Sequence, residues 1–244
     1  MESIMRILYF VLGWFALATS ACAQENPPPE NPVYYVGFNY FTGDGGLPES
    51  EVFSNYTAAL EPIMARYGMT LETYRVVNGS ADALPAHAIT FGSAPDPESF
   101  GAFFADPEFQ ALFPSLVGII DQHTVVFTRE AFSLAGTTEA DNILLSIGWI
   151  KEGADHHAAI LARDAAISQS GTQYGLETLV HSQGMMANQG LADGGIEVPA
   201  PDYLEIWRVE DPHGLFDDPM YREAESEARN HMDRSASYWL QPWS

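Results

Sequence analysis

The stretch FADPEFQALF, residues 104–113, decides the fold, because the chain carries a close copy of it further along. The copy, FDDPMYREAE, covers residues 216–225, 112 positions later, and keeps a phenylalanine, an Asp-Pro pair and a second aromatic ring at the same spacing. A motif that recurs within one chain indicates a repeated structural unit. We therefore interpret the sequence as two copies of one fold.

The Asp-Pro pair has a local structural task in this motif. Proline fixes its own φ and suits the first turn of a helix, and an aspartate before it can accept hydrogen bonds from the free N–H groups of that turn. We expect Asp106 and Asp218 to cap helices rather than to carry chemistry. The aromatic rings on either side would anchor each turn to a sheet.

Hydrophobic patterning predicts the same order of elements in both halves. In the first half we expect strands at 33–41, 70–79, 86–92 and 123–128, and helices at 50–67 and 100–112. In the second half we expect strands at 142–150, 176–184, 202–209 and 237–243, and helices at 155–171 and after the second Asp-Pro pair. This β-α-β-β-α-β order is that of the ferredoxin-like fold, and the predicted class is α+β.

A second short motif supports the repeat and leads to a family resemblance. LETYRVVNG (71–79) aligns with LETLVHSQG (176–184), and ALEPIMARYG (59–68) followed by PESFGAFFADPEFQALFP (97–114) resembles a family of the dimeric α+β-barrel superfamily. In that family one helix ends in Tyr-Gly and a second carries Asp/Ser-Pro-Glu-Tyr/Phe-Gln. The resemblance covers residues 33–130.

The resemblance is weaker over residues 142–244. Met220 and Arg222 replace the Glu and Gln of the motif, and the first helix lacks the closing Tyr-Gly at the same place. Superfamily members dimerise so that two four-stranded sheets close a barrel. A tandem copy implies two repeats that pair into an intramolecular α+β barrel, and hence a monomeric chain. Relatives include antibiotic-biosynthesis monooxygenases, EthD-like proteins, muconolactone isomerases and haem-binding peroxidases.

The N-terminus predicts export. Arg6 precedes an apolar run, Ile7–Ala18, which is too short to span a bilayer and is followed by the small-residue pattern Ala21-x-Ala23. We expect a signal peptide over residues 1–23 and a mature protein in the periplasm or the medium. The alternative is a lipoprotein anchored through Cys22, which is the only cysteine.

The rest of the chain divides into a proline-rich leader, two repeats and a linker. The leader covers 24–32, the first repeat 33–130, the linker 131–141 and the second repeat 142–244. The net charge of −23 excludes nucleic acid and anionic membrane surfaces as partners. The loop 184–201 is expected to cover one mouth of the barrel.

Strand alternation selects the candidate catalytic groups. If Leu71 and Leu176 pack under the helices, Glu72 and Glu177 point into the barrel, where an apolar cavity would displace their pKa values as general acid–base chemistry requires. His181, four residues after Glu177, is expected on the same face. The alternative is that both glutamates lie at the surface.

Other side chains are candidates for lining the cavity. The ligand-binding candidates are Tyr40, Tyr74, His87, His123, Trp149, Tyr203 and Trp207. His87, His123 and His181 could each act as a base or a haem ligand, and the alternative for each is a partly buried histidine bonded to backbone. No metal site is predicted, because Glu152 and His156 form an i,i+4 pair without a third ligand nearby.

The sequence therefore predicts an exported protein whose barrel cavity holds a small apolar or aromatic molecule. A cofactor-independent isomerase, cyclase or oxygenase fits that description, and no cofactor is predicted. Two alternatives stay open: a haem-binding protein with a strand histidine as axial ligand, and a non-enzymatic envelope module.

Overall fold

A computed structural model describes residues 32–42, 47–80, 83–128, 134, 137, 141–183, 186–189 and 200–243. The signal peptide, the leader, most of the linker and most of the loop 184–201 lie outside the described residues. The chain forms two compact units. Of the described residues, those within 32–72, 85–128 and 187–189 form unit 1, and those within 73–84, 134–186 and 200–243 form unit 2. The segment 73–84, which the repeat boundaries assign to the first half, thus belongs to unit 2.

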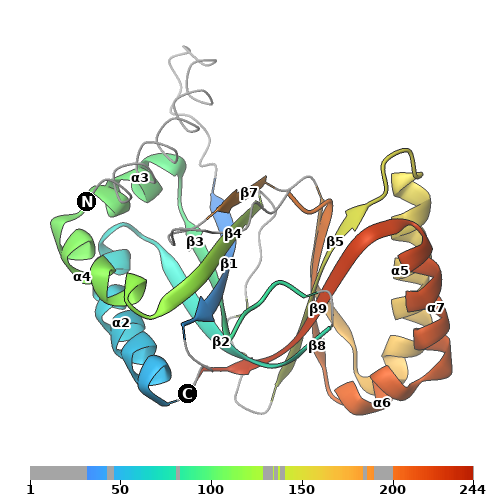
Figure 1. The fold of residues 1–244 in the computed structure, drawn as a ribbon. Helices are drawn as coiled ribbons and strands as arrows, with labels where there is room; N and C mark the ends of the chain where they lie inside the picture. Colours follow the sequence, from blue (N-terminus) through green and yellow to red (C-terminus); the bar gives the residue numbers. More distant parts are fainter. Residues whose placement is uncertain are drawn as a thin grey trace. The chain divides into compact units, whose positions relative to one another are not determined.

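Unit 1 has three helices on one face of an antiparallel sheet (Figure 1). Its elements are β1 (Val33–Phe41), α2 (Leu47–Arg66), the start of β2 (Thr70–Gly79), β3 (Ala88–Ala94), α3 (Pro97–Ala105), α4 (Pro107–Val117) and β4 (Ile120–Thr128). The strand order is β2-β3-β1-β4, the ferredoxin-like order. β7 (Met186–Gln189), which the sequence did not predict, follows β4 at the sheet edge.

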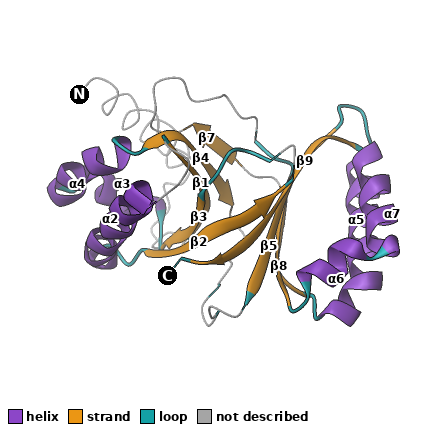
Figure 2. Cartoon of the chain, turned by 60° about the horizontal axis from the view of Figure 1, so that its bottom comes forward, coloured by secondary structure: helices purple, strands orange, loops and turns teal. Residues whose placement is uncertain are grey.

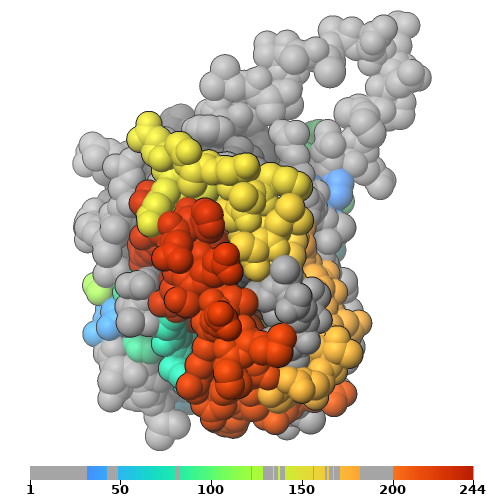
Figure 3. Space-filling view, turned by 90° about the vertical axis from the view of Figure 1, so that its right-hand side faces the viewer, coloured from blue at the N-terminus to red at the C-terminus, as the bar shows by residue number. Residues whose placement is uncertain are grey.

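Unit 2 repeats this plan. Its elements are β5 (Asn142–Ile150), α5 (His156–Gly171), the 3-10 helix η1 (Thr172–Tyr174), β6 (Glu177–Gln183), β8 (Tyr203–Val209), α6 (Pro212–Asp217), α7 (Pro219–Asn230) and β9 (Met232–Pro242). The strand order is β6-β8-β5-β9, and residues of β2 from Tyr74 onward pair with β9. The helices cover one face of this sheet (Figure 2). On the outside of the unit α5 and α7 lie side by side (Figure 3).

The central strands of the two units fix which positions are equivalent. β1 has a register shift at Tyr40/Phe41 against β4, and β5 has one at Trp149/Ile150 against β9. Counting back from these irregularities aligns Gly37 with Ser146. Their partners on the next strand then become equivalent: Thr90 pairs with Gly37, and Glu205 pairs with Ser146.

The Asp-Pro turns of both units make the same contacts. The Asp106 carboxylate accepts hydrogen bonds from the backbone N–H groups of Glu108 (2.7 Å) and Phe109 (3.3 Å), and from the Tyr67 hydroxyl at 2.7 Å. In unit 2, the Asp218 carboxylate accepts from the backbone N–H groups at positions 220 and 221 and from the Tyr174 hydroxyl at 2.8 Å. Both aspartates are therefore helix caps, as predicted. Asp106 also ties its turn to the end of α2, and Asp218 ties its turn to the end of the α5–η1 stretch.

The Tyr-Gly pair that the second half was expected to lack is present. Tyr174 and Gly175 end the helical stretch of α5 and η1, and one residue separates Gly175 from β6, as one residue separates Gly68 from β2 in unit 1. Gly175 has φ +65° and Gly68 has φ +66°, the left-handed conformation that glycine adopts at helix ends. The α-helix α5 ends at Gly171, as the expected range 155–171 has it, and η1 carries the helical stretch on to the left-handed turn at Gly175.

The substitution of glutamine by arginine in the second Asp-Pro motif preserves a contact. The Gln110 side-chain amide donates to the carbonyl oxygen of Phe104 (3.2 Å), and Arg222 Nε donates to that of Phe216 (2.7 Å).

Asp106 also divides the expected single helix over 100–112 into α3 and α4. The predicted α+β class with a ferredoxin-like order of elements is confirmed for both units.

Candidate functional site

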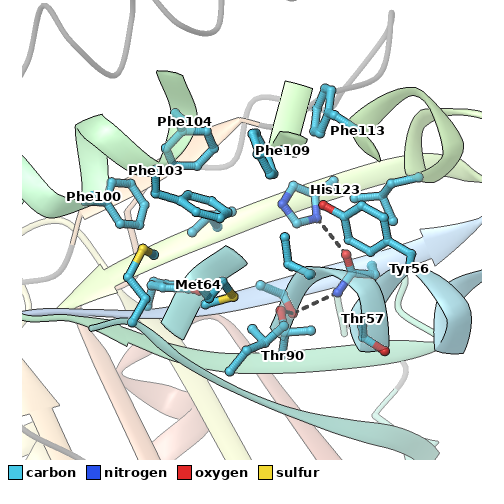
Figure 4. Close-up of a pocket in the computed structure, with 18 of the residues that line it drawn as sticks. Tyr56, Thr57, Met64, Thr90, Phe100, Phe103, Phe104, Phe109, Phe113 and His123 are labelled. Atoms are coloured by element: carbon cyan, nitrogen blue, oxygen red, sulfur yellow. Dashed lines mark hydrogen bonds between the residues drawn. The ribbon is translucent and has the colours of Figure 1, made fainter. Parts of the chain in front are cut away.

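A cavity of about 130 Å³ lies in unit 1, between its helices and its sheet. Aromatic rings of α3 and α4 form much of its roof, and α2 supplies one side (Figure 4). The roof includes Phe100, Phe103, Phe109 and Phe113, which are buried and pack against one another. The sequence interpretation placed the cavity on the opposite face of the sheet, and in unit 1 the cavity lies on the helix-covered face.

The floor of the cavity carries its polar groups. Asn39 of β1, Thr90 of β3 and His123 of β4 lie on the helix-covered face, where Asn39 and His123 are direct cross-strand partners. Gly37 leaves the room that these side chains need. A Cβ on Gly37 would lie 2.5 Å from Thr90 Oγ1 and 3.4 Å from His123 Cε1.

Hydrogen bonds fix the orientation of Asn39 and the tautomer of His123. The Asn39 side-chain amide donates to the backbone carbonyls of Gly37 and Ala88, both at 3.4 Å, so its oxygen faces His123. That oxygen lies 2.8 Å from His123 Nδ1. Because an amide oxygen can only accept, Nδ1 carries the proton, and Nε2 presents a lone pair.

His123 is neutral at physiological pH. Burial penalises the charged imidazolium and lowers the pKa of His123 to about 4. Among the described residues nothing pairs with Nε2 of His123. In Figure 4 the ring points into the space between the phenylalanines and Tyr56. The cavity therefore presents the Nε2 acceptor of His123 among mostly apolar and aromatic side chains.

The other histidine predicted in the first repeat has a structural position. His87 stacks on Tyr40 with ring centroids 4.6 Å apart, and its Nδ1 accepts from the backbone N–H of Phe41 at 3.1 Å. This matches the alternative of a histidine bonded to backbone. Neither His87 nor Tyr40 lines the cavity.

A bulge in β6 separates two predicted catalytic groups. The register of β6 against β8 shifts between Thr178 and Val180, so Glu177 pairs with Arg208 and His181 pairs with Glu205. Positions three apart on β8 point to opposite faces. The expectation that Glu177 and His181 share a face was therefore wrong. Alternation along a strand could not reveal the bulge.

The two predicted glutamates differ in their surroundings. Glu177 is 61% exposed and accepts a charge-assisted hydrogen bond from Arg208 Nη1 at 3.0 Å. Glu72 is half-buried on β2, next to Leu71, which lines the unit 1 cavity as expected for a residue beneath the helices. Glu72 points away from that cavity, so neither carboxylate reaches it. A catalytic role for either residue stays a prediction.

His181 belongs to a cluster with two carboxylates. Its Nδ1 lies 3.0 Å from Glu205 Oε1 and 3.7 Å from Asp164 Oδ1. The sequence interpretation missed Asp164 and Glu205. Glu205 could have been found, because a carboxylate in the middle of the apolar strand YLEIWRV is unusual. Asp164 gave no such signal, since acidic residues are common on exposed helix faces.

The four remaining aromatic candidates lie in unit 2 and are mostly buried in its core. The Tyr74 hydroxyl lies 2.6 Å from Thr137 Oγ1, and Trp149 lies under the Arg234 guanidinium at 5.0 Å. Tyr203 and Trp207 are at most 4% exposed. None of the four lines the unit 1 cavity.

No protein-family model matches the sequence, and no curated protein matches it. Among solved structures, an anthrone oxidase-like protein superimposes with a TM-score of 0.56 at 13% identity, over 88% of this chain and 92% of that one. A protein of Fusobacterium nucleatum assigned as a monooxygenase superimposes with a TM-score of 0.51 at 9% identity, over 88% of this chain and 94% of that one. Each unit has the ferredoxin-like α+β fold, and the likeness to these solved structures agrees with it. At these identities the likeness concerns the fold alone.

Haem does not fit the unit 1 cavity. A void of about 150 Å³ holds one benzene ring, and this cavity is slightly smaller at about 130 Å³. A haem macrocycle contains four pyrrole rings, so His123 could not ligate its iron without displacing the phenylalanine roof. We derive no chemistry through haem.

Within the described residues, no helix is long and apolar enough to cross a membrane.

Proposed function

We propose that this protein binds a small, one-ring aromatic molecule carrying a hydrogen-bond donor, such as a phenol, in the unit 1 cavity. The observation that carries the proposal is Nε2 of His123, which has no partner among the described residues and faces a cavity lined mostly by rings and aliphatic side chains. We further propose that the protein is exported, on the strength of the N-terminal pattern at 7–23.

The volume of the cavity sets the size of the ligand. Apolar cavities of about 150 Å³ take up benzene. The unit 1 cavity, at about 130 Å³, holds a single ring. An anthrone is a ketone with three fused rings, so the ligand proposed here is smaller than the molecule named for the anthrone oxidase-like structure. The name of the anthrone oxidase-like structure is compatible with an aromatic ligand.

The polar floor sets the chemistry of the ligand. An unpaired buried acceptor favours a ligand that donates a hydrogen bond, and an apolar lining disfavours a charged one. Burial raises the pKa of Tyr56, so its hydroxyl stays protonated. A phenol presents its O–H to His123 Nε2 and its ring to the phenylalanine roof.

The low basicity of His123 favours binding over proton transfer. A phenol has a pKa of about 10, and protonated His123 has one of about 4. Moving the proton from ligand to histidine therefore spans about six pKa units, or roughly 8 kcal/mol at 1.36 kcal/mol per unit. The histidine can orient a donor without deprotonating it. Proton abstraction by His123, a step available to an isomerase, cyclase or oxygenase, requires a ligand much more acidic than phenol.

Calorimetric titration with phenol and toluene tests the proposal. Wild type should bind phenol with one site per chain and prefer it over toluene by roughly 3- to 10-fold, the worth of one neutral hydrogen bond. The variant His123→Leu keeps the cavity filled to a similar extent but removes the acceptor. It should bind toluene at least as well as wild type and lose the preference for phenol.

Two outcomes would contradict the proposal. One is that neither ring compound binds. The other is that the preference for phenol survives in His123→Leu. As a matched control, His87→Leu removes a histidine of the same unit that does not line the cavity, and it should leave the preference unchanged.

A further inference from the structure

We propose that Asp164, His181 and Glu205 of unit 2 bind a divalent transition-metal ion. The three side chains come from α5, β6 and β8 and converge on one point. One ligand atom from each lies within 4.8 Å of the other two. This site is separate from the cavity of unit 1 and does not depend on the function proposed for it.

The distances within the cluster suit a metal. Zinc binds nitrogen and carboxylate oxygen at about 2.0–2.2 Å with tetrahedral geometry. Ligand atoms at those lengths lie roughly 3.3 Å from one another. The contacts from His181 Nδ1, at 3.0 Å to Glu205 and 3.7 Å to Asp164, bracket that separation.

The charges within the cluster call for a cation. Glu205 is 1% exposed, and a buried carboxylate is costly unless a positive charge compensates it. Asp164 brings a second carboxylate close to it. A protonated His181 supplies one positive charge, whereas a divalent ion balances both carboxylates and leaves the imidazole neutral, the form in which histidine binds metals.

The neighbouring basic residue on β8, Arg208, does not supply the positive charge that would compensate Glu205. Arg208, three positions after Glu205, points to the other face of the sheet and pairs with Glu177. On the cluster's own face, the next positions in the same row are Ser146 and Ser237, whose hydroxyls are neutral and lie 3.4 Å apart. The titratable groups of this cross-strand row of side chains are therefore His181 and Glu205, and Ser146 and Ser237 carry no charge.

The comparison between units shows that the fold does not require this cluster. Thr90 of unit 1 stands at the position equivalent to Glu205, and it forms part of the floor of the apolar cavity. Unit 1 therefore has a cavity with a neutral polar floor between its helices and its sheet. Unit 2 has the buried carboxylate of Glu205, which faces a histidine and an aspartate.

One nitrogen and two carboxylate oxygens suit Zn²⁺, Mn²⁺, Fe²⁺ or Co²⁺ rather than a soft metal. Because the side chains of Asp164 and His181 are 47% and 29% exposed, an ion can reach the site and keep water as a further ligand. Three protein ligands with an open position are typical of zinc sites that act on bound molecules.

Co²⁺ uptake by the whole chain tests the proposal, after treatment with a chelator and without an unfolding step. All proteins carry Cys22→Ser, which removes the one thiol. We expect one Co²⁺ per chain, seen as visible d–d absorption and displaced by Zn²⁺. Asp164→Asn and His181→Asn should each weaken Co²⁺ binding by more than about 10- to 100-fold, the loss that follows removal of a mere outer-shell partner. Both side chains are partly exposed, so these variants should fold, which circular dichroism verifies.

Glu177→Gln is the matched control, since it removes a carboxylate from the same strand on the opposite face. It should bind Co²⁺ as wild type does. The proposal is overturned if wild type gives no d–d absorption, or if Asp164→Asn and His181→Asn bind Co²⁺ as tightly as Glu177→Gln. The latter result would mean that the acidic surface binds metal nonspecifically and that His181 and Glu205 form only an ion pair.

Discussion

Enlarging the unit 1 cavity should change the size of ligand that the protein accepts. Leu60 on α2 is 6% exposed and lines the cavity. Leu60→Ala removes three carbon atoms, about 80 Å³. The cavity would grow from about 130 Å³ to roughly 200 Å³ if the walls stay in place. That space accepts two fused rings, so 1-naphthol should bind to the variant and not to wild type.

The substitution also has a calculable cost in stability. At about 24 cal/mol per Å³, the added volume costs about 2 kcal/mol, and the lost transfer free energy brings the total to about 3–4 kcal/mol. For a chain of this size the melting temperature should fall by about 10 °C. A ligand at 100 times its dissociation constant restores about 2.7 kcal/mol. Saturating 1-naphthol should therefore recover most of the loss.

Thermal unfolding of three proteins with and without 1-naphthol checks this reasoning. Leu215→Ala is the control, because Leu215 is fully buried in unit 2, away from the cavity. It should lose comparable stability and gain nothing from 1-naphthol. The reasoning is refuted if 1-naphthol stabilises Leu215→Ala as much as Leu60→Ala, or if it stabilises wild type equally.

Four further predictions follow from the structure and the sequence. The hydrogen bond from Tyr67 holds the pKa of Asp106 at about 2, below its unfolded value of about 3.9. The stabilisation that the ionised Asp106 gives is therefore present above about pH 4 and is lost as the pH falls toward 2. The difference in melting temperature between wild type and Asp106→Asn should shrink over that range, and a constant difference would contradict this. Gly68→Ala should cost about 1–2 kcal/mol in chemical denaturation because alanine is strained at positive φ, and Gly175→Ala should cost more because its Cβ would also lie 2.5 Å from the Glu210 side chain; equal stability to wild type would refute both. Mass spectrometry of the exported protein should find an N-terminus at Gln24, whereas a diacylglyceryl Cys22 would show a lipoprotein. Light scattering should find a monomer, and a stable dimer would show that the repeats pair between chains.

Local sequence patterns predicted most elements of the fold, but not β7 or the division of the helix over 100–112 into α3 and α4. The Asp-Pro pairs encode their own caps, because proline at the first helical position and aspartate before it act within one turn. The equivalence of the two motifs also held beyond the residues that match. Arg222 differs from Gln110 in charge, but each reaches the carbonyl two residues before its Asp-Pro pair. Sequence identity alone would have undervalued that repeat.

The candidate site depended on features that sequence patterns do not encode. His123 was a candidate, but its role depends on Asn39, whose amide orientation follows from cross-strand neighbours. The grouping of Glu177 with His181 failed because one bulged residue in β6 reverses the alternation of side chains. The side of the sheet that holds the cavity depends on how closely the helices pack, and hydrophobic periodicity does not report this.

The measurement that tests the central claim most directly is a crystal structure of the protein saturated with phenol. The account predicts density for one ring between the sheet and the helices α2, α3 and α4, with the phenol oxygen within hydrogen-bonding distance of His123 Nε2 and the His123 Nδ1–Asn39 contact preserved. A cavity filled by side chains, or phenol bound only elsewhere on the protein, would contradict it.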